Sequence, residues 1–279
     1  MTVKTRAFEY SPPEGFVLRR SGGVWFLQAS LLNACDGVTH AFCTRWGGAG
    51  AGAFADLNVS AAEGDDGRVV EKNWSMLAAA FRVRRDRFVT LHQVHGQEIM
   101  VVTDDPDTPE IAAGDGIITT RAGLAIGIKT ADCVPILLAD RARRVIGAVH
   151  GGWRGTSLNI SGKAVRMLRE TFSVKPSELL VAIGPAIGPC CYEVDERVRD
   201  AMGDDGRDEL LFRPVTGRGR WMMDLVEVNR RQLTASGVDP ERIAVARVCT
   251  ACRTDMFFSH RGEPGGTGRQ LSFIMMTGS

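Results

Sequence analysis

Two histidines and one cysteine, far apart in the chain, carry side chains that together suit a transition metal. His95 lies in the segment LHQVHG, Cys133 in KTADCVPILL and His150 in AVHGGWRGT. Each lies beside a run of apolar, β-branched residues, where a strand is expected to meet a polar or Gly-rich turn. Two imidazoles and one thiolate are the protein ligands of an open zinc site, whose fourth position stays available to water or substrate.

The same residue types permit other interpretations. Cys133 could be a nucleophile activated by His150, or a buried thiol with no chemical role. His92 lies three residues before His95, so the two are not expected to face the same point in a strand and turn. Of this pair, His95 is the better ligand candidate because Gly96 frees the backbone beside it.

The turn after His150 is a candidate anion site. Gly151 and Gly152 allow a ligand to approach the backbone closely, and Thr156 is placed to begin a helix whose first N–H groups attract anions. Arg154 adds a guanidinium that can bind phosphate through two hydrogen bonds. The alternative is an ordinary strand-to-helix turn with a surface arginine.

Two further residues are weaker candidates. Arg45, in TRWGG, lies in a second turn that joins an arginine to glycines, and we expect it to help bind phosphate unless it is only an exposed loop residue. Asp132, directly before Cys133, is a candidate for proton transfer or for supporting a metal ligand, although it could simply cap a turn.

Apolar periodicity predicts an α+β protein. Helices are predicted over residues 69–81 and 157–172, and a third begins at Asp224, where Glu227 completes capping-box spacing and Gly237 ends the helix. The predicted strands cover residues 88–91, 99–102, 116–119, 124–128, 134–138, 145–150, 179–183, 243–248 and 271–275. Their close spacing indicates mixed or antiparallel sheets covered by helices, with the metal site at converging strand ends.

Composition sets limits on function and location. The 279 residues include 34 Lys and Arg against 33 Asp and Glu, so no overall field favours nucleic acid or a membrane surface. We expect one catalytic domain over residues 1–279, with an irregular segment at 1–15 that lacks the apolar stretch of a secretory signal. A cytoplasmic protein that binds a small molecule, without nucleic acid or membrane partners, is therefore predicted.

The remaining cysteines are predicted to be ordinary reduced thiols. Cys249 and Cys252 form an isolated CxxC pair, and a structural zinc ribbon needs a second pair. The only other close pair, Cys190 and Cys191, is vicinal and poorly shaped for sharing one ion. The sequence leaves the roles of these residues open.

The sequence resembles the laccase-domain family, also called multicopper polyphenol oxidase-like, which includes bacterial peptidoglycan editing factors and purine nucleoside phosphorylases. The resemblance spans nearly the whole chain in order. Its segments are TRWGG (44–48), DLNVS (56–60), QVHG (93–96), ADCVPILL (131–138), AVHGGWRGT (148–156), IGPAIGPCCYEV (183–194) and the tail CT…FFSHR…TGRQ (249–270). It implies that His95, Cys133 and His150 are the metal ligands of an α+β domain.

The resemblance implies zinc-dependent phosphorolysis of adenosine, inosine or methylthioadenosine, with adenosine deamination as a related activity. Copper is a possible alternative metal. Copper-dependent polyphenol oxidation is disfavoured, because multicopper oxidases need a trinuclear cluster with many histidines and this chain has five. Two other possibilities stay open. One is a Cys133–His150 thiol amidase that edits peptidoglycan precursors, and the other is a non-catalytic regulator.

Overall fold

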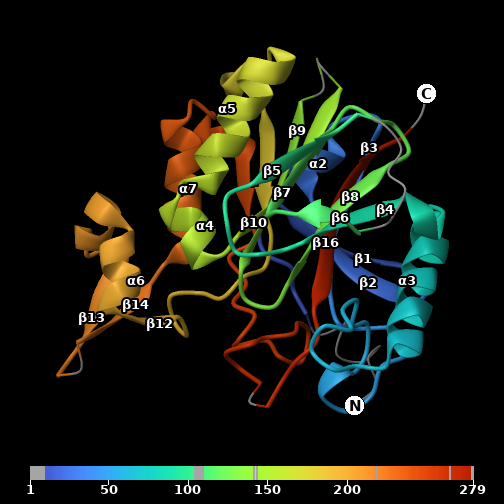
Figure 1. Ribbon diagram of the computed structural model, residues 1–279, viewed down its shortest axis with the longest axis horizontal. Helices are drawn as coiled ribbons and strands as arrows, with labels where there is room; N and C mark the ends of the chain where they lie inside the picture. Colours follow the sequence, from blue (N-terminus) through green and yellow to red (C-terminus); the bar gives the residue numbers. More distant parts are fainter. Residues whose placement is uncertain are drawn as a thin grey trace.

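Two stacked β-sheets lie at the centre of the protein, with helices on both outer faces (Figure 1). The computed structural model describes residues 10–103, 110–140, 142, 144–217, 219–263 and 265–277. Helix α3 (Gly67–Phe81) covers one sheet, and helices α5 (Ile160–Phe172) and α7 (Leu225–Ala235) cover the other. The predicted α+β class with mixed sheets and covering helices is confirmed.

The larger sheet contains both the first and the last strand of the chain that the structure describes. Its strands, in spatial order, are β1 (Phe16–Ser21), β2 (Val24–Ala29), β3 (Val38–Cys43), β16 (Gln270–Met276), β8 (Ala125–Thr130), β4 (Phe88–His92) and β6 (Glu110–Ala113). Strands β1 to β8 in this order pair antiparallel, whereas β4 pairs parallel with both β8 and β6.

The second sheet carries the residues that matter most for the site. Its strands, in spatial order, are β15 (Ile243–Val245), β11 (Leu180–Ile183), β9 (Val134–Asp140), β10 (Val145–Gly151), β7 (Gly116–Thr119) and β5 (Ile99–Val102). Strands β9 and β10 are buried along their whole length, because one face packs on the larger sheet and the other on α5 and α7.

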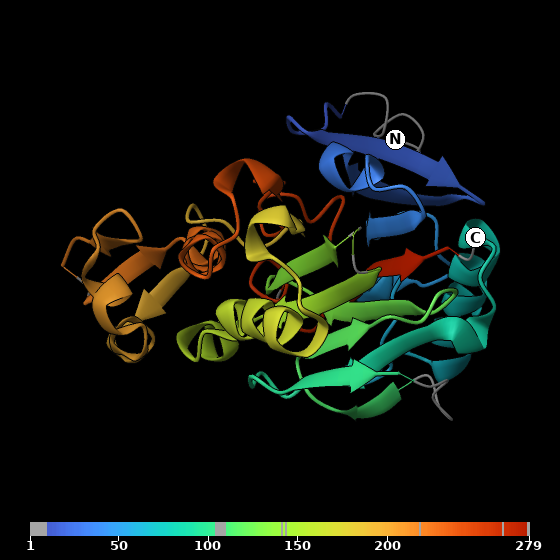
Figure 2. The ribbon, with the colours of Figure 1, turned by 90° about the horizontal axis from the view of Figure 1, so that it is seen from above.

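A small third sheet projects from the main body, as Figures 1 and 2 show. It consists of β12 (Glu193–Asp195), β14 (Arg220–Met223) and β13 (Phe212–Val215), with helix α6 (Glu196–Ala201) packed beside it. The remaining short helices are α2 (Ser30–Asn33) and α4 (Trp153–Ser157). Neither length nor apolar character suits any described helix to crossing a bilayer.

Most predicted elements are present with small shifts in their bounds. The helix predicted over 157–172 is α5, which begins at Ile160 because Asn159, with a φ of 57°, separates it from the short helix α4 and caps it through its side chain. Asp224 caps α7 as predicted, accepting a hydrogen bond from the Glu227 N–H at 2.9 Å. The strand predicted over 243–248 ends at Val245. Residues 10–15, the described part of the predicted irregular segment, precede β1.

A buried asparagine joins helices α4, α5 and α7, which pack beside strands β9 and β10. The Asn229 side chain, on α7, accepts a hydrogen bond from the Ser161 hydroxyl at 2.6 Å and donates one to the Thr156 hydroxyl at 2.9 Å. It also donates to the Leu225 carbonyl at 2.8 Å. These bonds hold α4, which directly follows His150, against α5 and α7.

We predict that Asn229→Ala lowers the free energy of unfolding by about 2 kcal/mol, because it leaves two buried hydroxyl groups without their partner. Denaturant unfolding followed by circular dichroism measures the change. Thr234→Ala, a half-buried position on the same helix, is the matched control and should change stability by less than about 0.5 kcal/mol. Equal effects of the two substitutions would contradict this role for Asn229.

Candidate metal centre

The structure brings His95, Cys133 and His150 together at one point. One ligand atom from each of these residues lies within 4.8 Å of the others. The two imidazole rings have centroids 4.9 Å apart and planes inclined by 67°. His150 is buried, Cys133 is half-buried and His95 is exposed, so the group opens toward solvent on one side. This arrangement could hold a metal ion and leave a coordination position free.

Strand register places Cys133 beside His150. Strands β9 and β10 pair antiparallel, with His150 opposite Pro135 and Gly151 opposite Val134. Cys133 is the residue directly before this paired segment, so its side chain lies at the same end of the sheet as the His150 ring. A shift of one residue in this register would turn the His150 side chain to the opposite face.

The turns that carry His95 and Cys133 both cross from the larger sheet to the second sheet. The first connects β4 to β5 and the second connects β8 to β9. Gln93 ties the first turn to the end of β8, because its side-chain amide donates to the Lys129 carbonyl at 2.8 Å and accepts from the Lys129 N–H at 2.7 Å. This amide continues the hydrogen bonding between β4 and β8 beyond the last paired residues.

A buried carboxylate organises two of the three ligands. Asp115 accepts hydrogen bonds from the backbone N–H groups of Val94, His95 and Gly96 at 3.3, 3.0 and 2.6 Å. It also lies 2.7 Å from the Nδ1 atom of His150. Asp115 therefore shapes the turn that carries His95 and directs the Nε2 atom of His150 toward the site. A carboxylate that orients a ligating histidine is a common feature of zinc sites.

Electrostatic interactions favour the thiolate form of Cys133. Burial raises the pKa of this thiol, but the adjacent His150 and His95 outweigh burial and lower it to about 6. For His150, burial lowers the pKa of the imidazole, but the negative charges of Cys133 and Asp115 outweigh burial and raise this pKa to about 9. Burial also raises the pKa of Asp115, yet its hydrogen bond to His150 and the N–H groups around it hold that pKa below its ordinary value.

The donor set and the space around it fit a metal ion. A Cβ atom at Gly152 would lie 2.8 Å from Nδ1 of His95 and 3.4 Å from the Cys133 sulfur. Any larger residue at position 152 would displace the His95 ring or the Cys133 sulfur. Thiolate and imidazole ligands suit zinc or copper better than magnesium or calcium.

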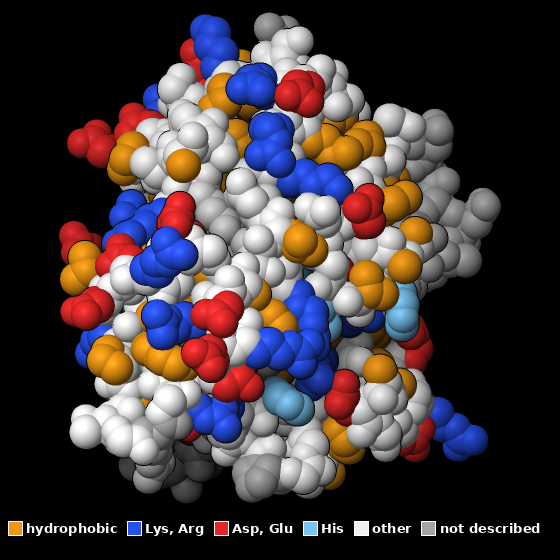
Figure 3. Space-filling view, turned by 60° about the vertical axis from the view of Figure 1, so that its left-hand side comes forward, with side chains coloured by type: hydrophobic (Ala, Val, Ile, Leu, Met, Phe, Trp, Pro, Cys, Tyr) orange, Lys and Arg blue, Asp and Glu red, His pale blue; other side chains and the backbone are white. Residues whose placement is uncertain are grey.

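The metal-ligand group opens into a cavity of about 730 Å³, within the range of small-molecule sites. Residues lining it beside the ligands include His92, Lys129, Trp153, Arg154, Tyr192 and Arg261. Figure 3 shows Lys and Arg side chains close to exposed His side chains on the surface of this part of the molecule. Cationic side chains around a small cavity favour an anionic ligand.

Arg154 is the predicted anion-binding residue that the structure brings to this cavity. Its side chain is exposed, and its guanidinium carbon lies 4.5 Å from the centroid of the Trp153 ring. Within the described part of the chain, no carboxylate is paired with it. Arg154 is therefore available to an anion beside the metal ligands.

Arg45 lies elsewhere. Its guanidinium donates to the carbonyls of Ala55 and Thr254 at 2.7 and 2.8 Å, and it forms an ion pair with Glu263 at 2.6 Å. It also lies over the Phe258 ring. These contacts are structural and Arg45 does not line the cavity, so the prediction that it binds phosphate conflicts with its position.

The glycine turn also differs from the prediction. Gly151 packs against Asn229, the hydroxyl of Thr156 is buried on the same asparagine, and neither residue lines the cavity. Gly152 does not line the cavity either, but it provides the close approach of His95 described above. The helix after His150 begins at Trp153 rather than near Thr156, which puts the threonine inside α4.

Asp132 lines the cavity, but donors surround its carboxylate. Its Oδ1 atom accepts hydrogen bonds from the hydroxyls of Thr250 and Ser259 at 2.6 and 2.7 Å, and its Oδ2 accepts from the Arg261 N–H at 2.7 Å. The Ile187 N–H also donates to its carbonyl. Asp132 thus fixes two distant loops next to Cys133.

Sequence reasoning missed several residues of the site. Asp115, Gln93 and Tyr192 each lie in polar or Gly-containing segments beside strands, and only the polarity of Asp115 at the start of a buried strand gave a usable signal. His260 lines the cavity, whereas His40 is buried in the larger sheet and accepts a hydrogen bond from the Ala29 N–H. Burial lowers the pKa of His40 to about 4, so this histidine stays neutral.

Fold and site together define an α+β protein with an open site of two histidines and one cysteine at a small-molecule cavity. Residues 39–277 match the sequence model of a family described as multi-copper polyphenol oxidoreductase laccase. The chain belongs to this family, and the resemblance noted from its motifs is confirmed.

Named relatives support the same assignment. The chain is 40% identical over 247 residues to purine nucleoside phosphorylase YlmD of Geobacillus stearothermophilus, covering 85% of this chain and 90% of the relative. It is 33% identical over 241 residues to purine nucleoside phosphorylase YfiH of Escherichia coli, covering 86% and 94%. The crystal structure of YlmD from Geobacillus stearothermophilus superposes with a TM-score of 0.88 at 37% identity, covering 95% of this chain and 100% of the other.

The electrostatic setting of Cys133 predicts that its alkylation in the metal-free, reduced protein depends on pH with a midpoint of about 6. The thiolate attacks iodoacetamide and displaces iodide, so the alkylation rate at Cys133 should be high at pH values above 6 and fall as the pH drops through about 6. An ordinary cysteine loses reactivity already below about pH 8.5. Mass spectrometry of the peptide that contains Cys133 measures the rate.

Asp115→Asn is the informative variant in this experiment. Removing the carboxylate charge weakens the imidazolium form of His150, so the inflection at Cys133 should move to higher pH. A wild-type inflection near pH 8.5 that is unchanged in Asp115→Asn would refute an ion pair between the Cys133 thiolate and the His150 imidazolium.

Proposed function

We propose that the protein is a zinc-dependent purine nucleoside phosphorylase acting on adenosine, inosine or methylthioadenosine. The observation that carries this proposal is the convergence of His95, Cys133 and His150 with Arg154 at one cavity. Relatives over most of the chain bear the name purine nucleoside phosphorylase, which supports the same activity. In phosphorolysis, a phosphate oxygen forms a bond to C1′ of the ribose while the C1′–N9 bond breaks and releases the base.

The residues of the chain have separable roles in this reaction. His95, Cys133 and His150 would hold the zinc ion, which would supply positive charge for binding an oxyanion. Arg154 binds phosphate through charge-assisted hydrogen bonds. Trp153 and Tyr192 line the cavity and offer aromatic surface to a purine.

Tyr192 and Asp132 support the reaction in different ways. Burial raises the pKa of the Tyr192 phenol, and the Cys133 charge raises it further, so the hydroxyl stays a hydrogen-bond donor. Asp132 holds the backbone of Arg261 at the cavity, and we assign it a positioning role rather than proton transfer.

A thiol amidase is the second candidate, and the lowered pKa of Cys133 beside His150 favours it. In that reaction the Cys133 sulfur would form a thioester with an acyl group of a peptidoglycan precursor, and His150 would protonate the leaving amine. Adenosine deamination at the same site, copper as the native metal, and a non-catalytic regulator are further alternatives. A cytoplasmic location and the lack of nucleic-acid or membrane partners stay predictions.

Product analysis tests the proposal. Zinc-loaded protein incubated with adenosine and phosphate should release adenine and ribose 1-phosphate, detected by chromatography. Cys133→Ala should lose this activity together with the zinc held by the site. Hypoxanthine as the first product would indicate a deaminase instead. A substrate-derived thioester on Cys133, without any free base, would favour the amidase, and full phosphorolysis by metal-free protein would exclude the zinc mechanism.

Arg154→Ala should raise the KM for phosphate by about tenfold or more, because a charge-assisted hydrogen bond contributes about 1.5–3 kcal/mol. The KM for adenosine should change much less. Arg154→Lys should recover part of the loss, since it keeps the charge but not the two-pronged geometry. Arg166→Ala, at an exposed arginine on α5, is the matched control. Equal phosphate KM values in all variants would exclude Arg154 from phosphate binding.

A further inference from the structure

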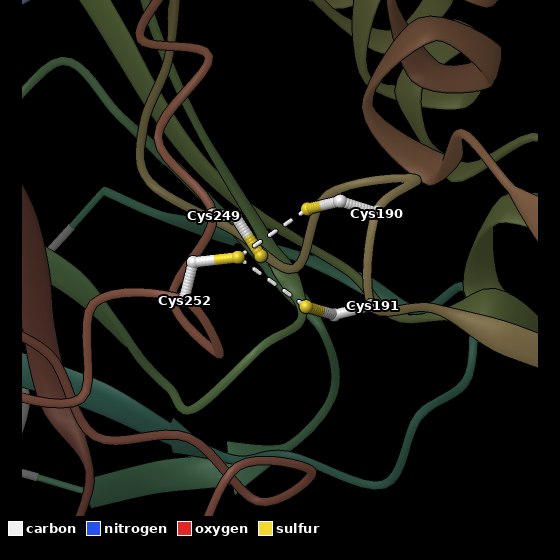
Figure 4. A group of neighbouring side chains, drawn as sticks. All are labelled: Cys190, Cys191, Cys249 and Cys252. Carbon is white, nitrogen blue, oxygen red and sulfur yellow. Dashed lines mark hydrogen bonds between the residues drawn. The ribbon is translucent and has the colours of Figure 1, made fainter.

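Four cysteines from two distant loops meet outside the site described above. Cys190 and Cys191 lie between β11 and β12, and Cys249 and Cys252 lie after β15. All four sulfurs are free and lie within 4.8 Å of one another. Figure 4 shows the sulfurs pointing toward a common centre, with dashed lines that join the Cys252 sulfur to those of Cys190 and Cys191. The sequence predicted ordinary reduced thiols and left their roles open, whereas the structure brings the two pairs into a single cluster.

We propose that this four-cysteine cluster (Cys190, Cys191, Cys249 and Cys252) binds a structural zinc ion. Cys252 lies 3.5 Å from the sulfur of Cys190 and 3.4 Å from that of Cys191. In a tetrahedral site with zinc–sulfur bonds of about 2.3 Å, neighbouring sulfurs lie about 3.8 Å apart. The cluster already has nearly these dimensions, so small rotations of the side chains complete the geometry.

The backbone around the cluster approaches its sulfurs closely. The Gly188 N–H donates to the Cys249 sulfur at 3.2 Å. A Cβ atom at Gly188 would lie 3.2 Å from Cβ of Cys249 and 3.3 Å from the Cys190 sulfur, so glycine allows the loop to approach closely.

Charge around the cluster also suits a thiolate-bound divalent ion. Four thiolates on one zinc ion carry a net negative charge, and nearby cations reduce the cost of that charge. Arg213 donates to the Pro189 carbonyl at 3.4 Å, and Arg261 donates to the Cys191 carbonyl at 3.3 Å. Cys190 and Cys252 are exposed, which gives the ion a path from solvent, and binding releases the thiol protons to water.

The position of the cluster indicates what the ion does. Ala186 and Cys249 form an isolated β-bridge, so the two loops already run side by side. Tyr192, which lines the cavity, directly follows Cys191, and the loop continues into the small sheet at β12. A zinc ion here fixes the base of the small sheet and one wall of the cavity to the main body.

Metal stoichiometry and cobalt spectra test the proposal on reduced full-length protein under anaerobic conditions. Wild-type protein should bind two equivalents of zinc, measured by atomic emission after gel filtration. The double variant Cys249→Ser/Cys252→Ser and the single variant Cys133→Ala should each lose one equivalent. The cobalt form of Cys133→Ala should keep the intense sulfur-to-metal charge-transfer absorption of a four-thiolate site, whereas the double variant should lose most of it.

The two variants separate this inference from the proposed function, on which it does not rest. Binding of one equivalent by wild-type protein, lost entirely in Cys133→Ala, would overturn the four-cysteine site and leave the phosphorylase proposal intact. If the double variant does not fold, Cys133→Ala alone decides: cobalt binding with four-thiolate absorption supports the site, and its absence refutes it. A disulfide between Cys252 and a neighbouring cysteine that persists under reduction, with no metal bound, would also refute it.

Discussion

The candidate metal centre depends on one buried carboxylate. Asp115 accepts three backbone N–H groups from the turn that carries His95, and it also contacts Nδ1 of His150. Its negative charge is stabilised by these donors in the interior, where an unpaired carboxylate would be costly. The same contacts decide which histidine nitrogen faces the site and how far the turn extends. The positions of both imidazoles thus depend on the hydrogen bonds that the Asp115 carboxylate accepts.

Much of the fold could be predicted from local sequence, because apolar periodicity reports which residues face a core. The strands around Cys133 and His150 were predictable, since β9 and β10 are continuous apolar runs bounded by polar turns. The three candidate metal ligands could be named from residue type and motif resemblance, and the structure brings their side chains together. Hairpin β13–β14 was missed because its strands are only four residues long and partly exposed, and such strands lack a strong apolar pattern.

The predicted roles that differ from the structure share a physical cause: the hydrogen-bond and ion-pair partners of a side chain depend on tertiary structure. Arg45 looked available for a ligand, yet its guanidinium is used by two carbonyls and Glu263, more than two hundred residues away. Thr156 looked like a helix cap, yet Asn229 holds its hydroxyl from another helix. Neither partner could be identified from local patterns, and the same is true of the meeting of Cys190 with Cys252.

Both turns that hold ligands, at 93–98 and 131–133, carry the chain from one central sheet into the other. Cys133 and His150 are held together by the pairing of β9 with β10 within the second sheet, so sliding of the larger sheet would reach the site through the β4–β5 turn that carries His95. A metal ion bound by all three side chains would join the two sheets at this point. With such coupling, the affinity of the site for a metal ion would depend on how firmly the apolar interface between the two sheets is packed.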